Sequence, residues 1–149
     1  MTQNDQALEA DAPVASHAVR VIGQVTLLAI FVQFILAGLG TFDTAHGGTF
    51  KDSNFTLHDR FALVIVALTV LMLIVALVTR SGRMVVGESL LLALLVGPVQ
   101  HALATTGTDH APWVGSLHVL TGVLILILDA HVAFPGRRRR PQASKSGAI

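Results

Sequence analysis

The segment FALVIVALTVLMLIVALVT, residues 61–79, decides the fold class, because it contains no charged residue, no glycine and no proline. An α-helix needs about 20 apolar residues to cross the hydrocarbon core of a bilayer. Further apolar stretches of similar length occupy residues 21–42, 84–103 and 114–134, and short polar connections separate them. The sequence therefore predicts an all-α membrane protein built as an antiparallel (up-down-up-down) four-helix transmembrane bundle.

Composition supports this class and sets the domain organisation. Of the 149 residues 52% are hydrophobic and 13% are charged, whereas a soluble domain has about 25% charged residues. We expect a polar N-terminal tail (1–20), a transmembrane domain (21–135) and a basic tail (136–149), with no length left for a second domain. The chain has no cysteine, which excludes disulfides, thiolate metal sites and covalent haem attachment through a cysteine pair.

Basic residues next to the apolar stretches predict the orientation in the membrane. Arg80 and Arg83 lie between the second and third stretches, and the run Arg137–Arg140 follows the fourth, whereas the connection 104–113 has neither Lys nor Arg. We therefore expect a multi-pass protein of a bacterial plasma (inner) membrane with both termini in the cytoplasm. The arginine run is interpreted as an orientation signal, and no nucleic-acid partner is expected.

Three of the seven histidines are expected at one depth in the outer half of the bundle. Counting about 1.5 Å per residue from the nearest cytoplasmic arginine puts His58 at roughly 33 Å, His101 at roughly 27 Å and His118 at roughly 28 Å. Polar groups within a membrane segment usually face the bundle interior and mark a functional site. The histidines therefore predict a site beneath the outer surface.

A haem held by two histidines is the first interpretation. The second and fourth helices form a diagonal pair in such a bundle, roughly 11–14 Å apart, which leaves room for a porphyrin between His58 and His118. His101 would be a substitute ligand or a partner of a propionate. The flanking small residues, Gly115, Gly122 and Ala62, lie three or four positions from a ligand and would give space to the flat macrocycle.

Two other interpretations stay open at this point. A Zn²⁺ or Cu²⁺ site near the outer surface would draw on histidines and acids from both outer connections, although the sequence has no close ligand pair such as HxxxH. Alternatively, each histidine only bonds a backbone carbonyl. The candidate metal ligands are His46, His58, His101, His110 and His118, with Asp43, Asp59 or Asp109.

Other polar residues in the apolar stretches give further expectations. Gln24 and Gln33 are nine residues apart, so they point in opposite directions and at most one faces the core. Glu88 and Asp129 lie near the cytoplasmic ends and are expected to pair with Arg80, Arg83 or Arg137, or Asp129 with another nearby basic group. Pro98 should bend the third helix one turn before His101. The outer connection 43–57 is either a lid over the site or a surface loop.

Three stretches carry a resemblance to known families. FVQFILAGLGTF (31–42), LHDRFALV (57–64) and LHVLTGVLIL (117–126) resemble a small four-span bacterial membrane family of unassigned function. The two LH stretches are also similar to one four-helix half of haem A synthase, which implies that His58 and His118 are axial ligands of haem iron. Asn54 stands where that enzyme has a Glu, so the resemblance implies haem binding and not the oxygenating chemistry.

We therefore expect a b-type cytochrome-like protein that carries haem b and exchanges electrons between membrane quinol and an outer partner. The glycines in the apolar stretches would also permit a homodimer. The alternative is a non-redox accessory or structural membrane protein, or a metal-handling one. No residue pattern assigns a catalysed reaction.

Overall fold

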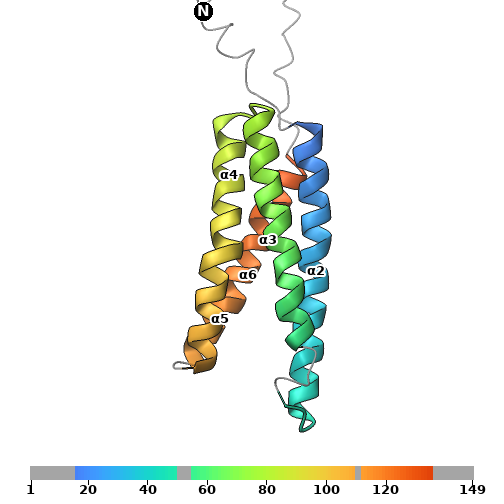
Figure 1. Ribbon diagram of the computed structural model, residues 1–149, viewed down its shortest axis with the longest axis vertical. Coiled ribbons are helices and arrows are strands. Elements are labelled where there is room, and N and C mark those ends of the chain that lie inside the picture. The colour runs from blue at the N-terminus through green and yellow to red at the C-terminus, as the bar shows by residue number, and fades with distance from the viewer. Residues whose placement is uncertain (1–15, 50–54, 110–111, 136–149) are drawn as a thin grey trace, which may run out of the picture.

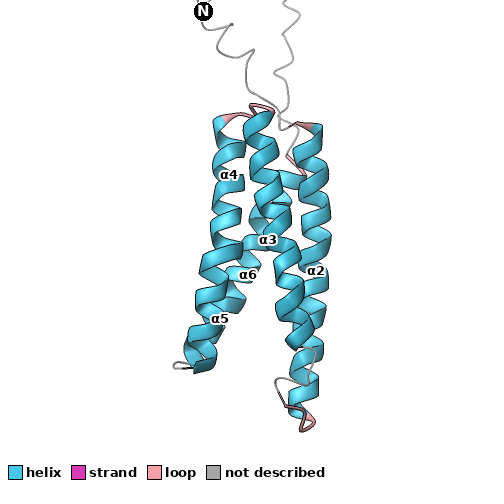
Figure 2. Ribbon diagram, viewed as in Figure 1, coloured by secondary structure: helices cyan, strands magenta, loops and turns pink. Residues whose placement is uncertain are grey.

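The computed structural model describes residues 16–49, 55–109 and 112–135, and these form four helical rods. The first is α2 (His17–Ala45) and the second is α3 (Phe55–Val78). The third combines α4 (Arg83–Leu94), the π-helix η2 (Leu95–Val99) and α5 (Gln100–Asp109), and the fourth is α6 (Pro112–Ala133). Figure 2 shows no strand in the described ranges, so the prediction of an all-α chain with four helices is confirmed.

All four rods begin before the apolar stretches that predicted them, and the first and third also end later, because polar residues join their ends. Ser16 caps α2, and its hydroxyl accepts a hydrogen bond from the Val19 N–H at 3.3 Å. At the other end of α2, the hydroxyls of Thr41 and Thr44 donate to backbone carbonyls one turn earlier. These bonds satisfy the hydroxyl groups within the helix, so the polar residues are accommodated at its end.

The third rod departs from regular α-helix where it contains Pro98. Proline has no N–H, so it cannot donate to the carbonyl four residues earlier, and its ring crowds the preceding turn. The helix widens into the five-residue π-segment Leu95–Val99 and becomes α-helical again at Gln100. A π-segment accommodates one extra residue per turn, so it changes which side chains face the core on either side of it.

The four rods pack in a ring in which each contacts two neighbours. α2 packs against α3 and α6, α4 packs against α3, and α5 packs against α6, so α3 and α6 form a diagonal pair. Figure 1 shows the start of α2, the α3–α4 turn and the end of α6 at one end of the bundle. A hydrogen bond of 3.3 Å from Thr79 Oγ1 to Ser16 Oγ ties the first two of these together.

Fully buried apolar side chains gather toward that end of the bundle. Val19, Met72, Ala76 and Leu92 are fully buried there. Gly23 lets α2 approach α6 closely, since a Cβ at this position would lie 3.3 Å from the Cα and N atoms of Ala133. Toward the opposite end the pair α2–α3 and the pair α5–α6 diverge (Figure 1).

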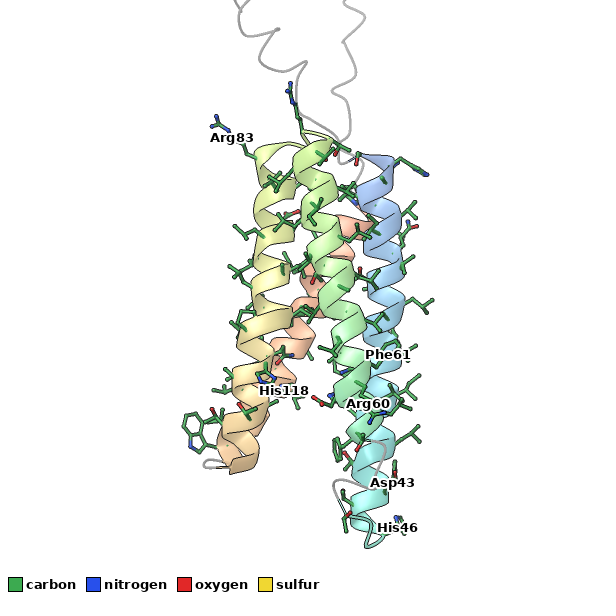
Figure 3. All side chains as sticks on the ribbon, in the orientation of Figure 1. Asp43, His46, Arg60, Phe61, Arg83 and His118 are labelled. Carbon is green, nitrogen blue, oxygen red and sulfur yellow. The ribbon has the colours of Figure 1, made fainter. Side chains whose placement is uncertain are left out.

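The structure shows no arginine partner for Glu88 or Asp129 among the described residues, and one expected partner, Arg137, lies outside them. Glu88 Oε1 lies 3.0 Å from His131 Nδ1 on α6. Asp129 is fully buried, and neither carboxylate oxygen has a hydrogen-bond partner among the described residues. The arginines of the α3–α4 turn are exposed instead, as Figure 3 shows for Arg83, because charged groups at a helix end are readily solvated.

The outside of the bundle is apolar on all sides. Leu28, Leu63 and Val78 are 66%, 69% and 77% exposed. Exposed apolar side chains on this scale are unfavourable in water and favourable against lipid. All four rods are long and apolar enough to cross a membrane.

Candidate functional site

A cavity of about 660 Å³ lies between the rods in the half of the bundle where the helix pairs diverge. All four rods contribute to its wall. Its volume is within the range of about 300–1,000 Å³ that is usual for cofactor and ligand pockets. The wall is mostly apolar, and its polar part includes Gln33, His58, Gln100, His101 and His118.

Within this cavity His58 and His118 lie close together. Their ring centroids are 6.4 Å apart and the ring planes are inclined at 60°. The two residues come from the diagonal helices α3 and α6, so the rings bridge the centre of the bundle rather than a helix–helix seam. At this separation the nearest ring nitrogens are at best about 4 Å apart, too far for a direct hydrogen bond.

Each of the two rings is held by a backbone carbonyl of the preceding rod. The Nδ1 atom of His58 lies 3.2 Å from the Gln33 carbonyl oxygen, and Nδ1 of His118 lies 3.2 Å from the Gln100 carbonyl oxygen. A carbonyl oxygen only accepts, so Nδ1 carries the hydrogen in both rings. In its neutral form each ring then has an unprotonated Nε2, the arrangement that histidine ligands of metals use.

The glutamines themselves add two polar groups to the site. Gln33 Nε2 donates to the His58 carbonyl oxygen at 2.9 Å, so this pair is joined by two hydrogen bonds. The Oε1 atoms of Gln33 and Gln100 are buried and have no partner within the described ranges. Gln24 is exposed, in agreement with the expectation that at most one of the two glutamines of α2 faces the core.

The other predicted site residues are distributed unevenly. His101, Ala62 and Gly122 line the cavity, whereas Gly115 does not. A Cβ on Gly122 would lie 3.3 Å from Gln100 Nε2 and 3.5 Å from Phe34 Cζ, so this glycine makes room for those side chains. Gly38 and Gly97, which also line the cavity, face open space. Gly38 and Gly97 therefore leave more open space beside the cavity than Gly115 and Gly122 do.

The three imidazoles predicted at one depth do not form a single cluster. The structure pairs His58 with His118, whereas His101 is exposed on the cavity wall, and no ring contact joins it to the other two. Among the described residues no three His, Asp or Glu side chains converge closely enough to hold a metal ion. His46 lies at the far end of α2 (Figure 3), and His110 is outside the described residues.

Gln100 was missed in the reasoning from sequence, although a repeated pattern identifies it. VQFILAGLGT (32–41) and VQHALATTGT (99–108) share six of ten residues, and each is followed by Leu-His, at 57–58 and at 117–118. The spacing continues beyond the histidines: Ile65 and Ile125 are both buried, and so are Thr69 and Asp129. The two helix pairs therefore correspond in this pattern, and each contributes one Gln and one His to the cavity wall.

The length and apolar composition of the four rods indicate a multi-pass membrane protein. The chain belongs to a family of unknown function, DUF6220, whose sequence profile matches residues 33–107. That segment includes Gln33, His58, Gln100 and His101, and ends before α6. No curated protein and no solved structure matches the chain, so the resemblance to haem A synthase finds no support there.

Proposed function

We propose that this protein is an integral-membrane, b-type cytochrome-like electron carrier that holds haem b between His58 and His118. The observation that carries the proposal is the 6.4 Å separation of two imidazoles whose Nδ1 atoms are both tied to backbone carbonyls. Both rings belong to the wall of one cavity, which is large enough for a flat cofactor.

The separation of the rings distinguishes between kinds of metal site. With a metal–nitrogen bond of about 2.0 Å, two imidazoles on opposite sides of a metal have ring centroids roughly 6.3 Å apart, whereas two ligands of a tetrahedral ion are roughly 5 Å apart. The 6.4 Å between His58 and His118 agrees with the first arrangement. Two histidines in this arrangement would hold a haem iron.

The surroundings fit the same cofactor. Apolar side chains such as Ile30, Val96 and Ile125 line the cavity and would contact the macrocycle, while Gly38 and Gly97 leave open space beside it. The two Gln carbonyls would fix the orientation of the ligand rings. Bound haem would supply one-electron transfer, and a membrane quinol is the partner that suits a carrier of this kind.

The proposal includes the position in the membrane. We place the four rods across a bacterial plasma membrane in alternating directions, with the basic α3–α4 turn and both termini in the cytoplasm. The cavity then lies toward the outer face. Trp113, exposed at the start of α6, would be an interfacial anchor on that side.

An absorption spectrum of protein purified after haem-replete expression tests the proposal. We expect a Soret band and a sharp α-band on reduction, and we expect His58→Ala and His118→Ala each to lose the low-spin α-band. His46→Ala is the matched control, because its Nδ1 also lies 2.8 Å from a backbone carbonyl but outside the cavity. A folded wild-type protein without a Soret band would overturn the proposal and leave a non-redox membrane protein.

A further inference from the structure

A second buried polar position lies in the opposite half of the bundle from the histidine pair. Asp129 on α6 is fully buried, and both of its carboxylate oxygens lack a hydrogen-bond partner among the described residues. It is 11 residues from His118, about 16 Å along a helix, so it belongs to neither the cavity nor its wall. The proposed electron carrier makes no use of it.

Two buried hydroxyl groups lie at the same level of the bundle as Asp129, but neither donates a hydrogen bond to its carboxyl group. Gly23 of α2 lies beside Ala133 of α6, and Glu88 of α4 pairs with His131 of α6. Counting along the helices from these two contacts places Asp129 level with Thr26 and Ser89, which are both fully buried. Each of these hydroxyls donates its single hydrogen to a carbonyl of its own helix, Ile22 O at 2.9 Å and Val85 O at 2.8 Å. Neither of these two hydroxyl hydrogens is therefore available to Asp129.

Among the described residues, charged groups of the neighbouring rods do not neutralise it either. On α2 the nearest is Arg20, which makes no ion pair with Asp129, and on α4 Glu88 is engaged with His131. α3 has no charged residue between Arg60 and Arg80, and η2 and α5 have none before Asp109. An ionised Asp129 would therefore be a buried charge with neither a cation nor a hydrogen-bond donor among the described residues, which is strongly unfavourable.

We infer that Asp129 is a proton-binding site, held as the neutral acid inside the bundle and loaded from the end of the bundle that carries the arginines. It is four residues, about 6 Å, from the end of α6 at Ala133, so the path to that end is short. Packing does not require an acid here, because the equivalent position in the first helix pair is the fully buried Thr69. The inference is independent of haem binding.

Infrared spectroscopy of the purified full chain tests this inference. We expect a carbonyl stretching band of a protonated carboxylic acid at pH 7, shifted in D₂O and by ¹³C labelling of aspartate, and removed at alkaline pH. Asp129→Asn and Asp129→Thr should both abolish the band. Asp129→Thr copies the residue of the equivalent position, and the exposed Asp59 supplies the control Asp59→Asn, which should keep the band.

Two results would overturn the inference. One is a wild-type protein that shows no aspartate band of the neutral acid at pH 7, a measurement on labelled protein that needs no variant. The other is a band that disappears at pH 7 when Na⁺ replaces K⁺, since a metal cation would then be the occupant. The histidine-dependent haem spectrum is unaffected by either result, so the two proposals fail separately.

Discussion

The hydrogen bonding between Gln33 and His58 runs in both directions across the α2–α3 contact. The imidazole Nδ1 donates to one backbone carbonyl and the Gln33 amide donates to the other. A ring held in this way has one tautomer and a restricted orientation, because rotation would break a bond to a carbonyl that cannot move independently of its helix. At the residue scale, the glutamine orders the ring before any ligand binds.

Replacing Gln33 by Leu should lower the free energy of unfolding by about 1 kcal/mol, since one partly buried hydrogen bond is lost. The Gln33 side chain supplies only the 2.9 Å hydrogen bond to the His58 carbonyl. The bond from His58 Nδ1 to the backbone carbonyl of residue 33 is kept, so the imidazole should stay in place but become less ordered. Thermal unfolding in detergent measures the change. Gln24→Leu makes the same chemical change on the exposed face of α2, and an equal loss there would contradict the argument.

At the scale of the element, the apolar stretches predicted four helices but not their irregularity. Four helices could be predicted because the length and hydropathy of a helix can be read from its own sequence. The π-segment around Pro98 follows from the missing N–H of proline, and the sequence predicted a bend there. Whether the helix kinks or widens depends on how neighbouring rods pack, which no local pattern specifies.

Gly23→Val should destabilise the α2–α6 contact by about 1–3 kcal/mol, because a Cβ there would lie 3.3 Å from two backbone atoms of Ala133. The backbone of α6 cannot move aside as a flexible side chain would. Gly87→Val is the control, since a Cβ at this exposed position meets nothing within 4 Å. Both changes have the same effect on helix propensity, so the difference in unfolding temperature measures the contact alone.

At the scale of the whole molecule, the sequence predicted how deep each histidine lies along the bundle. It did not predict toward which neighbour each histidine points. Counting residues placed His58, His101 and His118 at one level, yet the rotation of each rod decides which rings meet. The structure pairs the first with the third and leaves His101 exposed on the wall. The repeated VQ and LH pattern is the sequence signal that would have favoured this pair, because equivalent units place equivalent side chains on opposite sides of one axis.

Gly97→Leu should fill the cavity without unfolding the bundle. A side chain at this lining position meets no atom within 4 Å at its Cβ, so it extends into open space. We expect the haem absorbance per protein to fall at least several-fold while the unfolding temperature of the ligand-free protein is kept or raised, since Leu favours helix over Gly by about 1 kcal/mol. Gly87→Leu, outside the cavity, should retain the full absorbance; equal absorbance in both variants would show that the ligand lies elsewhere.

The orientation of the whole bundle can be tested with single cysteines, because the chain has none of its own. Arg83→Cys places a thiol at the end that carries the α3–α4 turn, and His46→Cys places one at the opposite end, both at exposed positions (Figure 3). In intact cells a membrane-impermeant maleimide should label position 46 and leave position 83 unlabelled until the membrane is permeabilised, because arginines are retained on the cytoplasmic side. Arg80 and the run Arg137–Arg140 remain in the variant, so its orientation signal is largely kept. If position 83 alone were labelled in intact cells, the bundle would have the opposite orientation and the histidine cavity would lie toward the cytoplasm.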